Sequence, residues 1–485
     1  MNQREYFTSR WALLFAALAM AIGAGNIWRF PRLAGQYGGA FLIPWLIFLF
    51  LWSIPLLMVE FSIGRKTRKG VIGSFMDLMG PNYTWMGGFV AFCTMAIMFY
   101  YSVVSGWAMH YFWMAITGSL QNINHAEFWD HFITSRQPII FHLIALSLGS
   151  FIIYRGIIKG LEKANKIFLP VLLLLLFVGI GRAITLPNAS IGLNYLFDIR
   201  LEYLLDYQVW LEGLSQSAWS TGAGWGLILT YSVYMKEKED IVLNSFITGF
   251  GNNSASLLAG LAIIPTIFAL APSVAEAEVA LKAGNDGLSF IVIPQLFNQL
   301  PAASLFSSVF FLGLLLAALS SLIAMLELST RILMDFGLAR KKALPIVAAI
   351  TAVLGLPSAL SYHFFRNQDW VWGLGLIISG SFFALLIIRF GVEKFRKEYL
   401  NVVQGDLRVG RWFTLVVKYI IPIEAIVLVV WWLYRAVGWN PEGWYNPFQA
   451  ESLGTCITQW LLLILLLLLL NKKIVGWLKM NQGIE

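Results

Sequence analysis

The sequence predicts an all-α integral membrane protein with twelve transmembrane helices. Hydrophobic residues make up 58% of the chain and charged residues only 12%, and the mean hydropathy is +0.72. One water-soluble core cannot bury so much apolar surface, so the lipid bilayer is the expected solvent of this chain. Apolar stretches of about 20 residues, the length that spans a bilayer, recur from Trp11 to Lys479 with short polar breaks.

Twelve candidate spans can be placed along the chain. They begin near residues 11, 40, 85, 138, 164, 208, 241, 303, 343, 369, 412 and 453. The first span lacks the short apolar core and cleavage site of a signal peptide, so we expect it to be retained. Cys93 and Cys456 both lie inside apolar spans, which suits packing rather than a disulfide framework or a metal site.

Basic residues mark alternate loops, and an excess of Lys and Arg is typical of loops that stay in the cytoplasm. The pattern predicts a multi-pass protein of the inner cell membrane with both termini cytoplasmic. It also explains the formal charge of +8 without a nucleic-acid partner. The residues concerned are Arg4, Arg10, Arg65, Lys66, Arg68, Lys69, Arg155, Lys159, Lys163, Lys166, Arg340, Lys341, Lys342, Lys394, Arg396, Lys397, Arg408, Arg411, Lys472, Lys473 and Lys479.

Two segments depart from the composition of an ordinary spanning helix. Met20-Ala-Ile-Gly-Ala-Gly-Asn26 lies in the first span and Trp219-Ser-Thr-Gly-Ala-Gly-Trp225 in the sixth. Glycine readily leaves helical geometry, and unwound backbone at membrane depth is tolerated where it lines a cavity or is buried in protein. The pair suggests a central site, although the glycines alone leave small-residue helix packing as an alternative.

The two breaks fall in the first helix of two successive blocks of five helices. Transporters built from inverted repeats place their discontinuous helices there. We therefore assign residues 1–200 to a first repeat with spans one to five and residues 201–400 to a second with spans six to ten. Residues 401–485 hold spans eleven and twelve and the C-terminus.

Neutral polar side chains lie beside both breaks. Asn26 follows the first, Ser220 lies in the second, and Asn252 and Ser256 share one face of the seventh span. Ser320 and Ser321 adjoin each other in the eighth span. Each alone is more often a contact between helices, but together with carbonyls freed at a break such oxygens suit a hard monovalent cation.

At this point the sequence resembles a known family. Gly23-Ala-Gly-Asn-Ile-Trp-Arg-Phe-Pro31 resembles the signature of the neurotransmitter:sodium symporter family, whose members have the LeuT fold, and the likeness runs over nearly the whole chain. The resemblance implies a secondary active symporter that imports a neutral, apolar amino acid with sodium by alternating access. It leaves monomer and homodimer open.

The resemblance implies two sodium sites. The first would use Ala21, Asn26, Ser220 and Asn252, with the substrate carboxylate as a further ligand. The second would use carbonyls of Ala19, Ile22 and Ala317 and the hydroxyls of Ser320 and Ser321. A serine at position 320 or 321 keeps the oxygen of the threonine that bacterial relatives often carry there.

The resemblance also implies where the substrate binds. The amides of Ala24 and Gly25 and the Tyr101 hydroxyl would meet its carboxylate, and carbonyls of the breaks, including that of Ala21, its ammonium. Relatives that carry biogenic amines have an Asp in place of Gly23, so glycine here favours an amino acid. The remaining pocket residues would be Ile97, Trp219, Ser220, Gly222, Trp225, Ser321 and Met325, an apolar set that should reject charged side chains.

Charged residues in relatives form two gates, and matching positions exist here. Arg29 would pair with Asp369, expected at the start of the tenth span, across the outer vestibule. On the cytoplasmic side Arg4 would pair with Asp335, aided by Phe7 and Tyr234.

Chloride is a candidate cofactor beside sodium. Many bacterial relatives place a carboxylate at the position of Ser256, whereas chloride-dependent relatives place a serine. Gln216, Ser220, Asn252 and Ser256 match four chloride-binding positions, and the fifth, ordinarily Tyr, is Trp45.

Two other functions fit the same scaffold: an amino-acid sensor without concentrative transport, and a channel. Polar residues at both ion sites and two gate pairs favour coupled transport over either. An enzyme is not indicated, because the five histidines are scattered and no metal-spaced cluster or nucleophile–base pair is apparent.

Overall fold

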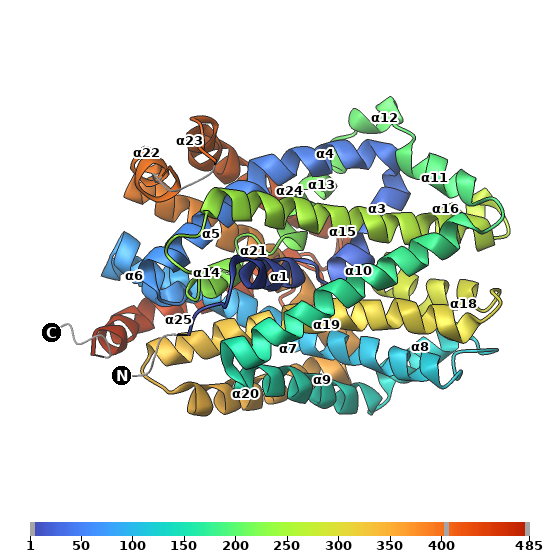
Figure 1. The fold of residues 1–485 in the computed structure, drawn as a ribbon, viewed down its shortest axis with the longest axis horizontal. Coiled ribbons are helices and arrows are strands. Elements are labelled where there is room, and N and C mark those ends of the chain that lie inside the picture. The colour runs from blue at the N-terminus through green and yellow to red at the C-terminus, as the bar shows by residue number, and fades with distance from the viewer. Residues whose placement is uncertain (1–4, 402–406, 481–485) are drawn as a thin grey trace.

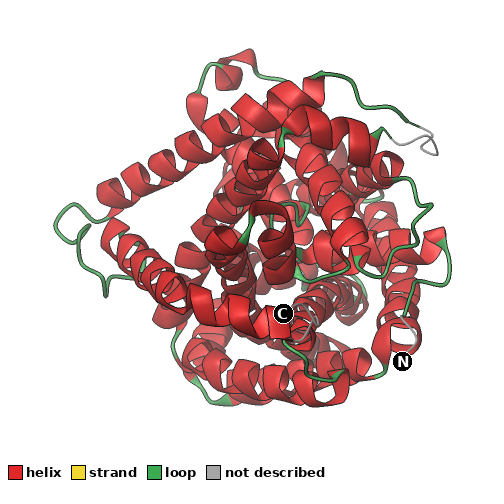
Figure 2. Cartoon of the chain, turned by 90° about the vertical axis from the view of Figure 1, so that its left-hand side faces the viewer, coloured by secondary structure: helices red, strands yellow, loops and turns green. Residues whose placement is uncertain are grey.

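A computed structural model describes residues 5–401 and 407–480, which are almost entirely helical (Figure 2). Ten helical segments in these residues are long and apolar enough to cross a membrane. The first and sixth spans are broken into shorter helices, which completes the twelve. The prediction of an all-α membrane protein with broken helices one and six is confirmed.

The first five spans run as follows along the chain. The helices are α1 (Arg10–Ala21), α2 (Ala24–Ile27) and α3 (Arg29–Tyr37) in the first span, α4 (Leu42–Phe48) and α5 (Ile54–Thr67) in the second, α7 (Thr84–Ile116) in the third, α9 (Gln137–Tyr154) in the fourth and α10 (Lys163–Ile184) in the fifth. Shorter connecting helices are α6 (Val71–Met79), α8 (His125–Thr134), α11 (Ala189–Phe197) and α12 (Leu201–Leu204).

The remaining spans begin with the second broken helix. They are α13 (Tyr207–Ser220) with α14 (Leu227–Ser232), α15 (Ile241–Leu270), α19 (Ala303–Asp335), α20 (Arg340–Leu360), α21 (Tyr362–Phe390), α23 (Trp412–Leu415) continuing into α24 (Ile421–Trp439), and α25 (Leu453–Met480). The connecting helices are α16 (Val274–Ala280), α17 (Gly284–Asp286), α18 (Ile293–Phe297) and α22 (Val392–Phe395).

The expected start of the tenth span was wrong by seven residues, whereas the other starts agree to within three. The polar run from Tyr362 to Gln368 had the composition of a loop. In the structure it forms the first two turns of α21, because Ser361 Oγ accepts a hydrogen bond from Phe364 N (3.2 Å) and caps the helix. Asp369 therefore lies two turns inside the helix.

Three long helices, α7, α19 and α21, form the largely buried centre of the molecule, with α19 packed along α7. Helices α9, α10 and α25 are peripheral, and α10 crosses the face seen in Figure 1 over α15 and α19. Their outward side chains are large and apolar, for example Leu174, Phe177, Leu462 and Leu469. Such a surface is stable against lipid rather than water.

The two ends of the helix bundle differ in charge. Arg65, Arg68, Lys69 and Arg340 gather at the end where Phe336, after α19, packs edge-on against Trp477 of α25. The opposite end carries α8, α11, α16 and α18, on the right in Figure 1. We name these the basic end and the vestibule end.

Candidate functional site

The first span is interrupted between α1 and α2. Ile22 and Gly23 leave helical geometry, and Gly23 N donates to the Ala21 carbonyl (3.0 Å), which releases the Ala19 carbonyl from its usual partner four residues on. The Asn26 side chain supports the new helix start, since its Oδ1 accepts from Gly23 N (3.0 Å). The Ala24 amide donates to the Tyr101 hydroxyl (3.2 Å).

The second break separates α13 from α14 and depends on three glycines. Gly222, Gly224 and Gly226 all have positive φ, between 69° and 88°, where other residues are strained. A Cβ on Gly224 would also lie 2.7 Å from the Gly380 Cα of α21. The break is therefore both a backbone conformation and a close helix contact that only glycine permits.

Buried side chains from other helices hold the second break. The Glu60 carboxylate of α5 accepts hydrogen bonds from Gly224 N (2.6 Å) and Leu229 N (3.1 Å), and the Thr94 hydroxyl of α7 donates to the Trp225 carbonyl (2.7 Å). Glu60 is fully buried. A carboxylate at the start of α14 satisfies amides that have no partner within the helix.

The predicted residues of the first sodium site lie together where the two breaks meet. Asn26 Nδ2 contacts Ser220 Oγ (3.2 Å), the Asn252 carbonyl (3.2 Å) and Ser256 Oγ (2.8 Å). With the Asn252 amide oriented so that both of its ends are satisfied, its nitrogen donates to the Ala21 carbonyl oxygen (3.1 Å) and its oxygen accepts from Ser220 Oγ (2.9 Å). Three helices and one freed carbonyl thus form one buried neutral cluster, the polar cluster below.

The residues of the second predicted sodium site lie on α19 and at the end of α1, and a hydrogen bond joins the two helices there. Ser320 Oγ donates to the Ala317 carbonyl (2.8 Å), and Ser321 Oγ donates to the Met20 carbonyl (3.2 Å). The Ser321 hydroxyl therefore faces the end of α1, where the Ala19 carbonyl has lost its helical partner, the Gly23 amide, whereas the Ser320 hydroxyl is bonded within α19.

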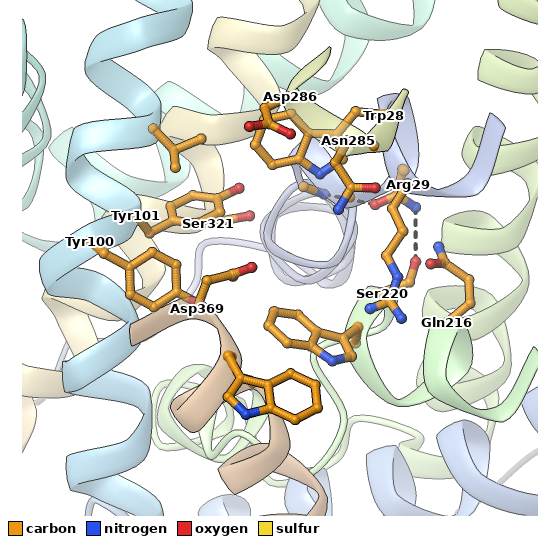
Figure 3. Close-up of a pocket in the computed structure, with 18 of the residues that line it drawn as sticks. Trp28, Arg29, Tyr100, Tyr101, Gln216, Ser220, Asn285, Asp286, Ser321 and Asp369 are labelled. Carbon is orange, nitrogen blue, oxygen red and sulfur yellow. Dashed lines mark hydrogen bonds between the residues drawn. The ribbon is translucent and has the colours of Figure 1, made fainter. Parts of the chain in front are cut away.

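A cavity of about 610 Å³ extends from the two breaks to the vestibule end (Figure 3). Nine of the eleven predicted substrate residues line it: Ala21, Gly25, Tyr101, Trp219, Ser220, Gly222, Trp225, Ser321 and Met325. The other two, Ala24 and Ile97, do not. Besides Tyr101, the lining includes ionisable side chains, namely Arg29, Arg32, Tyr100, Lys282, Asp286, Tyr362, Arg366, Asp369 and Glu451.

Gly23 has no room for a side chain. A Cβ there would lie 2.8 Å from Ser321 Oγ and 3.4 Å from the Tyr101 hydroxyl, whereas a Cβ on Gly25 would meet nothing within 4 Å. The cavity therefore opens beside Gly25, above the first turn of α2. The amides exposed at this helix start favour a negative group there.

The tryptophan at position 219 fits because its neighbour on α21 is glycine. A Cβ on Gly373 would lie 2.1 Å from the Trp219 ring. Trp219 and Trp225 meet edge-on with ring centres 6.0 Å apart, and the Arg29 guanidinium lies 5.5 Å from the Trp219 ring. These rings form one wall between the inner cavity and the vestibule.

Arg29 and Asp369 are not joined in this conformation. Arg29 Nη2 lies 3.7 Å from Glu212 Oε2 and donates to Ser215 Oγ (2.6 Å), so its partners are on α13. Asp369 lies beside Tyr100 on the other side of the cavity (Figure 3). The predicted outer ion pair is absent because the open cavity separates the two side chains.

The basic end is closed by a different set of contacts. Glu327 of α19 is fully buried and binds Arg340 through two hydrogen bonds (2.5 and 2.8 Å), and it accepts from the Tyr234 hydroxyl (2.5 Å). Phe7 N donates to the Tyr234 carbonyl (3.0 Å). Asp335 pairs with Arg331 (2.8 Å), while its predicted partner Arg4 lies outside the described residues.

Two buried donors near the polar cluster have no partner among the described residues. They are the Trp45 indole nitrogen and the Gln216 side-chain amide, and both residues are 5% exposed or less. Helices α4 and α13 pack together so closely that a Cβ on Gly213 would lie 3.1 Å from Trp45 N. Buried donors usually have an acceptor, so an anion at this place would complete their hydrogen bonding.

Sequence reasoning missed the three buried acids of this site, Glu60, Glu212 and Glu327. Each lies in an apolar stretch, and an ionisable residue within a span is a functional signal by itself. Glu60 lies within the apolar second span. Its role became visible only with the partner amides of α14.

Comparison with known proteins agrees with this geometry. The model of the sodium:neurotransmitter symporter family matches residues 4–136 and 130–475. An uncharacterised sodium-dependent transporter of Methanocaldococcus jannaschii is 30% identical over 88% of this chain and 90% of its own length, and a sodium- and chloride-dependent betaine transporter of Caenorhabditis elegans is 26% identical over 93% and 84%. The crystal structure of MhsT in complex with L-phenylalanine superposes with a TM-score of 0.78 at 29% identity, covering 88% of this chain and 99% of MhsT.

The chain belongs to the sodium:neurotransmitter symporter family. It is a multi-pass membrane transporter with the fold of MhsT, not an enzyme, and its transport is coupled to sodium. The family likeness inferred from Gly23 to Pro31 is thereby confirmed.

Replacing Glu60 with Gln should destabilise the protein. A Gln side chain has one oxygen, which can accept from only one of the two amides, Gly224 N or Leu229 N, and its NH₂ group then faces the other amide. The loss of a hydrogen bond to a charged group costs about 1.5–3 kcal/mol of stability. We expect a lower thermal unfolding midpoint in detergent. Glu393→Gln, a change at a more exposed acid outside the spans, is the control, and an equal midpoint for both variants would contradict the role given to Glu60.

Glu212→Gln and Asp369→Asn should shift the vestibule in opposite directions. Without the Glu212 charge, Arg29 loses the partner that holds it on α13 and becomes free to pair with Asp369, whereas Asp369→Asn removes the alternative partner. The readout is maleimide labelling of Val104→Cys, a cavity position, since the native Cys93 and Cys456 are buried. We expect labelling to slow in the first variant and to quicken in the second; the same direction in both would exclude this exchange of partners.

Proposed function

We propose that this transporter imports a neutral amino acid with an apolar side chain, driven by sodium bound at two sites. The observation that carries the proposal is the inner cavity. It joins the amides at the start of α2 and the Tyr101 hydroxyl to the apolar side chains of Trp219, Trp225 and Met325, next to the polar cluster. MhsT, of similar fold, is seen with L-phenylalanine, which fits such a pocket.

Gly23 supports an amino acid over an amine. An amine without a carboxylate needs a protein carboxylate for its ammonium, and at position 23 any side chain would crowd Ser321 and Tyr101. An amino acid brings its own carboxylate, which can bind the amides of α2 and the first sodium together. Ion and substrate then each raise the affinity of the other.

We place the protein in the inner membrane with its basic end on the cytoplasmic side. Both termini then also lie on that side. The excess of Arg and Lys at that end follows the rule for cytoplasmic loops. The cavity then opens outward while Glu327, Arg340 and Tyr234 close the inner side. Alternating access requires these two states to exchange. We propose in addition that residues 1–200 and 201–400 form the two inverted repeats.

Uptake into proteoliposomes tests the function. With an inward sodium gradient we expect accumulation of labelled neutral apolar amino acids and none in matched vesicles with potassium. The decarboxylated amine of the best substrate should be carried poorly. Saturable binding without sodium-driven accumulation would instead indicate a sensor, and preference for the amine would overturn the substrate class.

We also propose that chloride binds beside the first sodium, at Trp45, Gln216, Ser220, Asn252 and Ser256. Two unpartnered N–H donors and the absence of a carboxylate at Ser256 support it. Replacing chloride with gluconate should lower uptake several-fold, and Ser256→Glu, which supplies a fixed negative charge, should remove that dependence. Ser256→Gln, of similar size but neutral, is the control. Equal uptake in gluconate and chloride by the unaltered protein would exclude the chloride site.

A further inference from the structure

We propose that an anionic phospholipid binds in a crevice between α10, α15 and α19, with its headgroup on Arg182 and one acyl chain directed toward Ile27. The crevice is distinct from the substrate cavity and shares no lining residue with it. One of its walls is α10, a peripheral helix whose Leu174 and Phe177 side chains point outward. The bilayer is therefore the source of its occupant.

The walls of the crevice are apolar. Leu176, Ile263, Phe297 and Phe310 line it, and the hydroxyl of Thr266 is already satisfied by the Ala262 carbonyl (2.7 Å). Water needs two or more polar partners to remain in such a space, and none is left inside. A hydrocarbon chain needs none and gains free energy from the contact with these side chains.

Arg182 supplies the charge at the mouth. It lies in the last turn of α10, where its Nη1 donates to Thr185 Oγ1 (3.1 Å) and its guanidinium lies 5.5 Å from the Phe306 ring. Among the described residues no carboxylate pairs with it, unlike Arg29, Arg331, Arg340 and Arg366. A cation held at the membrane interface without an acidic partner attracts an anionic headgroup.

The size of the crevice selects a single chain. From Arg182 to Leu175 the wall of α10 covers seven residues, about 10 Å at the rise of an α-helix. That length suits part of one acyl chain below its headgroup. A peptide would bring backbone polar groups into walls that cannot pair them.

The inner end of the crevice reaches the broken first span. Ile27 lines it and is the last residue of α2, directly after Asn26 of the polar cluster. A bound chain would therefore pack against the four-residue helix that carries part of the ion site. Through this contact the lipid composition of the membrane would change the affinity of the protein for sodium.

Photo-crosslinking measures the binding directly, without a transport assay. The full protein is reconstituted in phosphatidylcholine vesicles with a phosphatidylglycerol that carries a diazirine in its acyl chain, and labelled peptides are mapped. We expect labels on α10, α15 and α19 near the crevice. Arg182→Gln should lower this labelling about fivefold, the change for about 1 kcal/mol per basic residue near a membrane surface.

Two glycines of the region provide a matched pair. Gly313→Leu should abolish the labelling, because its Cβ fits beside Leu172 at 3.7 Å and its branches then occupy the crevice. Gly181→Leu, at an exposed position with nothing within 4 Å, should leave it unchanged. Ala262→Phe fills the crevice from α15 and replaces Gly313→Leu if that variant does not fold.

Three results would overturn the proposal. They are unchanged labelling after the crevice is filled, equal labelling by a diazirine phosphatidylcholine, and displacement of the phospholipid only by free fatty acid. Equal labelling by phosphatidylcholine would show that Arg182 does not select an anionic headgroup. Displacement only by free fatty acid would show that the occupant is not a phospholipid. If the unaltered protein shows no sodium-driven uptake, the proposed function is contradicted, but the result of the labelling experiment still stands.

Discussion

Backbone hydrogen bonding at the middle of the membrane is the constraint on which this structure depends. Each break frees amides and carbonyls where no water is available to replace their partners. At the first break the Asn26 side chain accepts from the Gly23 amide and the Tyr101 hydroxyl of α7 accepts from the Ala24 amide. At the second break Glu60 accepts from the Gly224 amide and Thr94 donates to the Trp225 carbonyl. The Ala19 carbonyl, which loses its helical partner at the first break, is a group that a cation can bind.

Close packing imposes a second constraint through glycine. Gly224 permits the break between α13 and α14 to pack closely against Gly380 of α21. Gly373 leaves room for the Trp219 ring to pack against α21. The large tryptophan and the small glycine therefore form one unit. A substitution at either position changes the wall between the inner cavity and the vestibule, so the two residues should be considered together in any account of substrate size.

The sequence predicted the fold, and it singled out polar side chains that the structure brings together, because both depend on local patterns. Gly-Ala-Gly within an apolar span indicates a break, and Asn252 with Ser256 can share a face only on a helix. The pairing of Arg29 was not accessible in this way, because it has acids on both α13 and α21 within reach in different conformations. A single sequence encodes both partners, and only a structure shows which one is in use. The start of α21 was missed for a related reason, since its polar first turns line a vestibule that composition cannot distinguish from a loop.

The contacts at the two ends of the molecule differ in kind, and this difference bears on the transport cycle. At the basic end the Glu327–Arg340 pair joins neighbouring continuous helices, α19 and α20, and Glu327 also accepts from the hydroxyl of Tyr234, which follows α14. At the vestibule end Arg29 and Glu212 both belong to broken spans. The polar cluster lies between them and includes Asn26 and Ser220, one from each break. A movement of either break that displaces Asn26 or Ser220 therefore alters this cluster, and Arg29 and Glu212 connect the same two spans at the vestibule end.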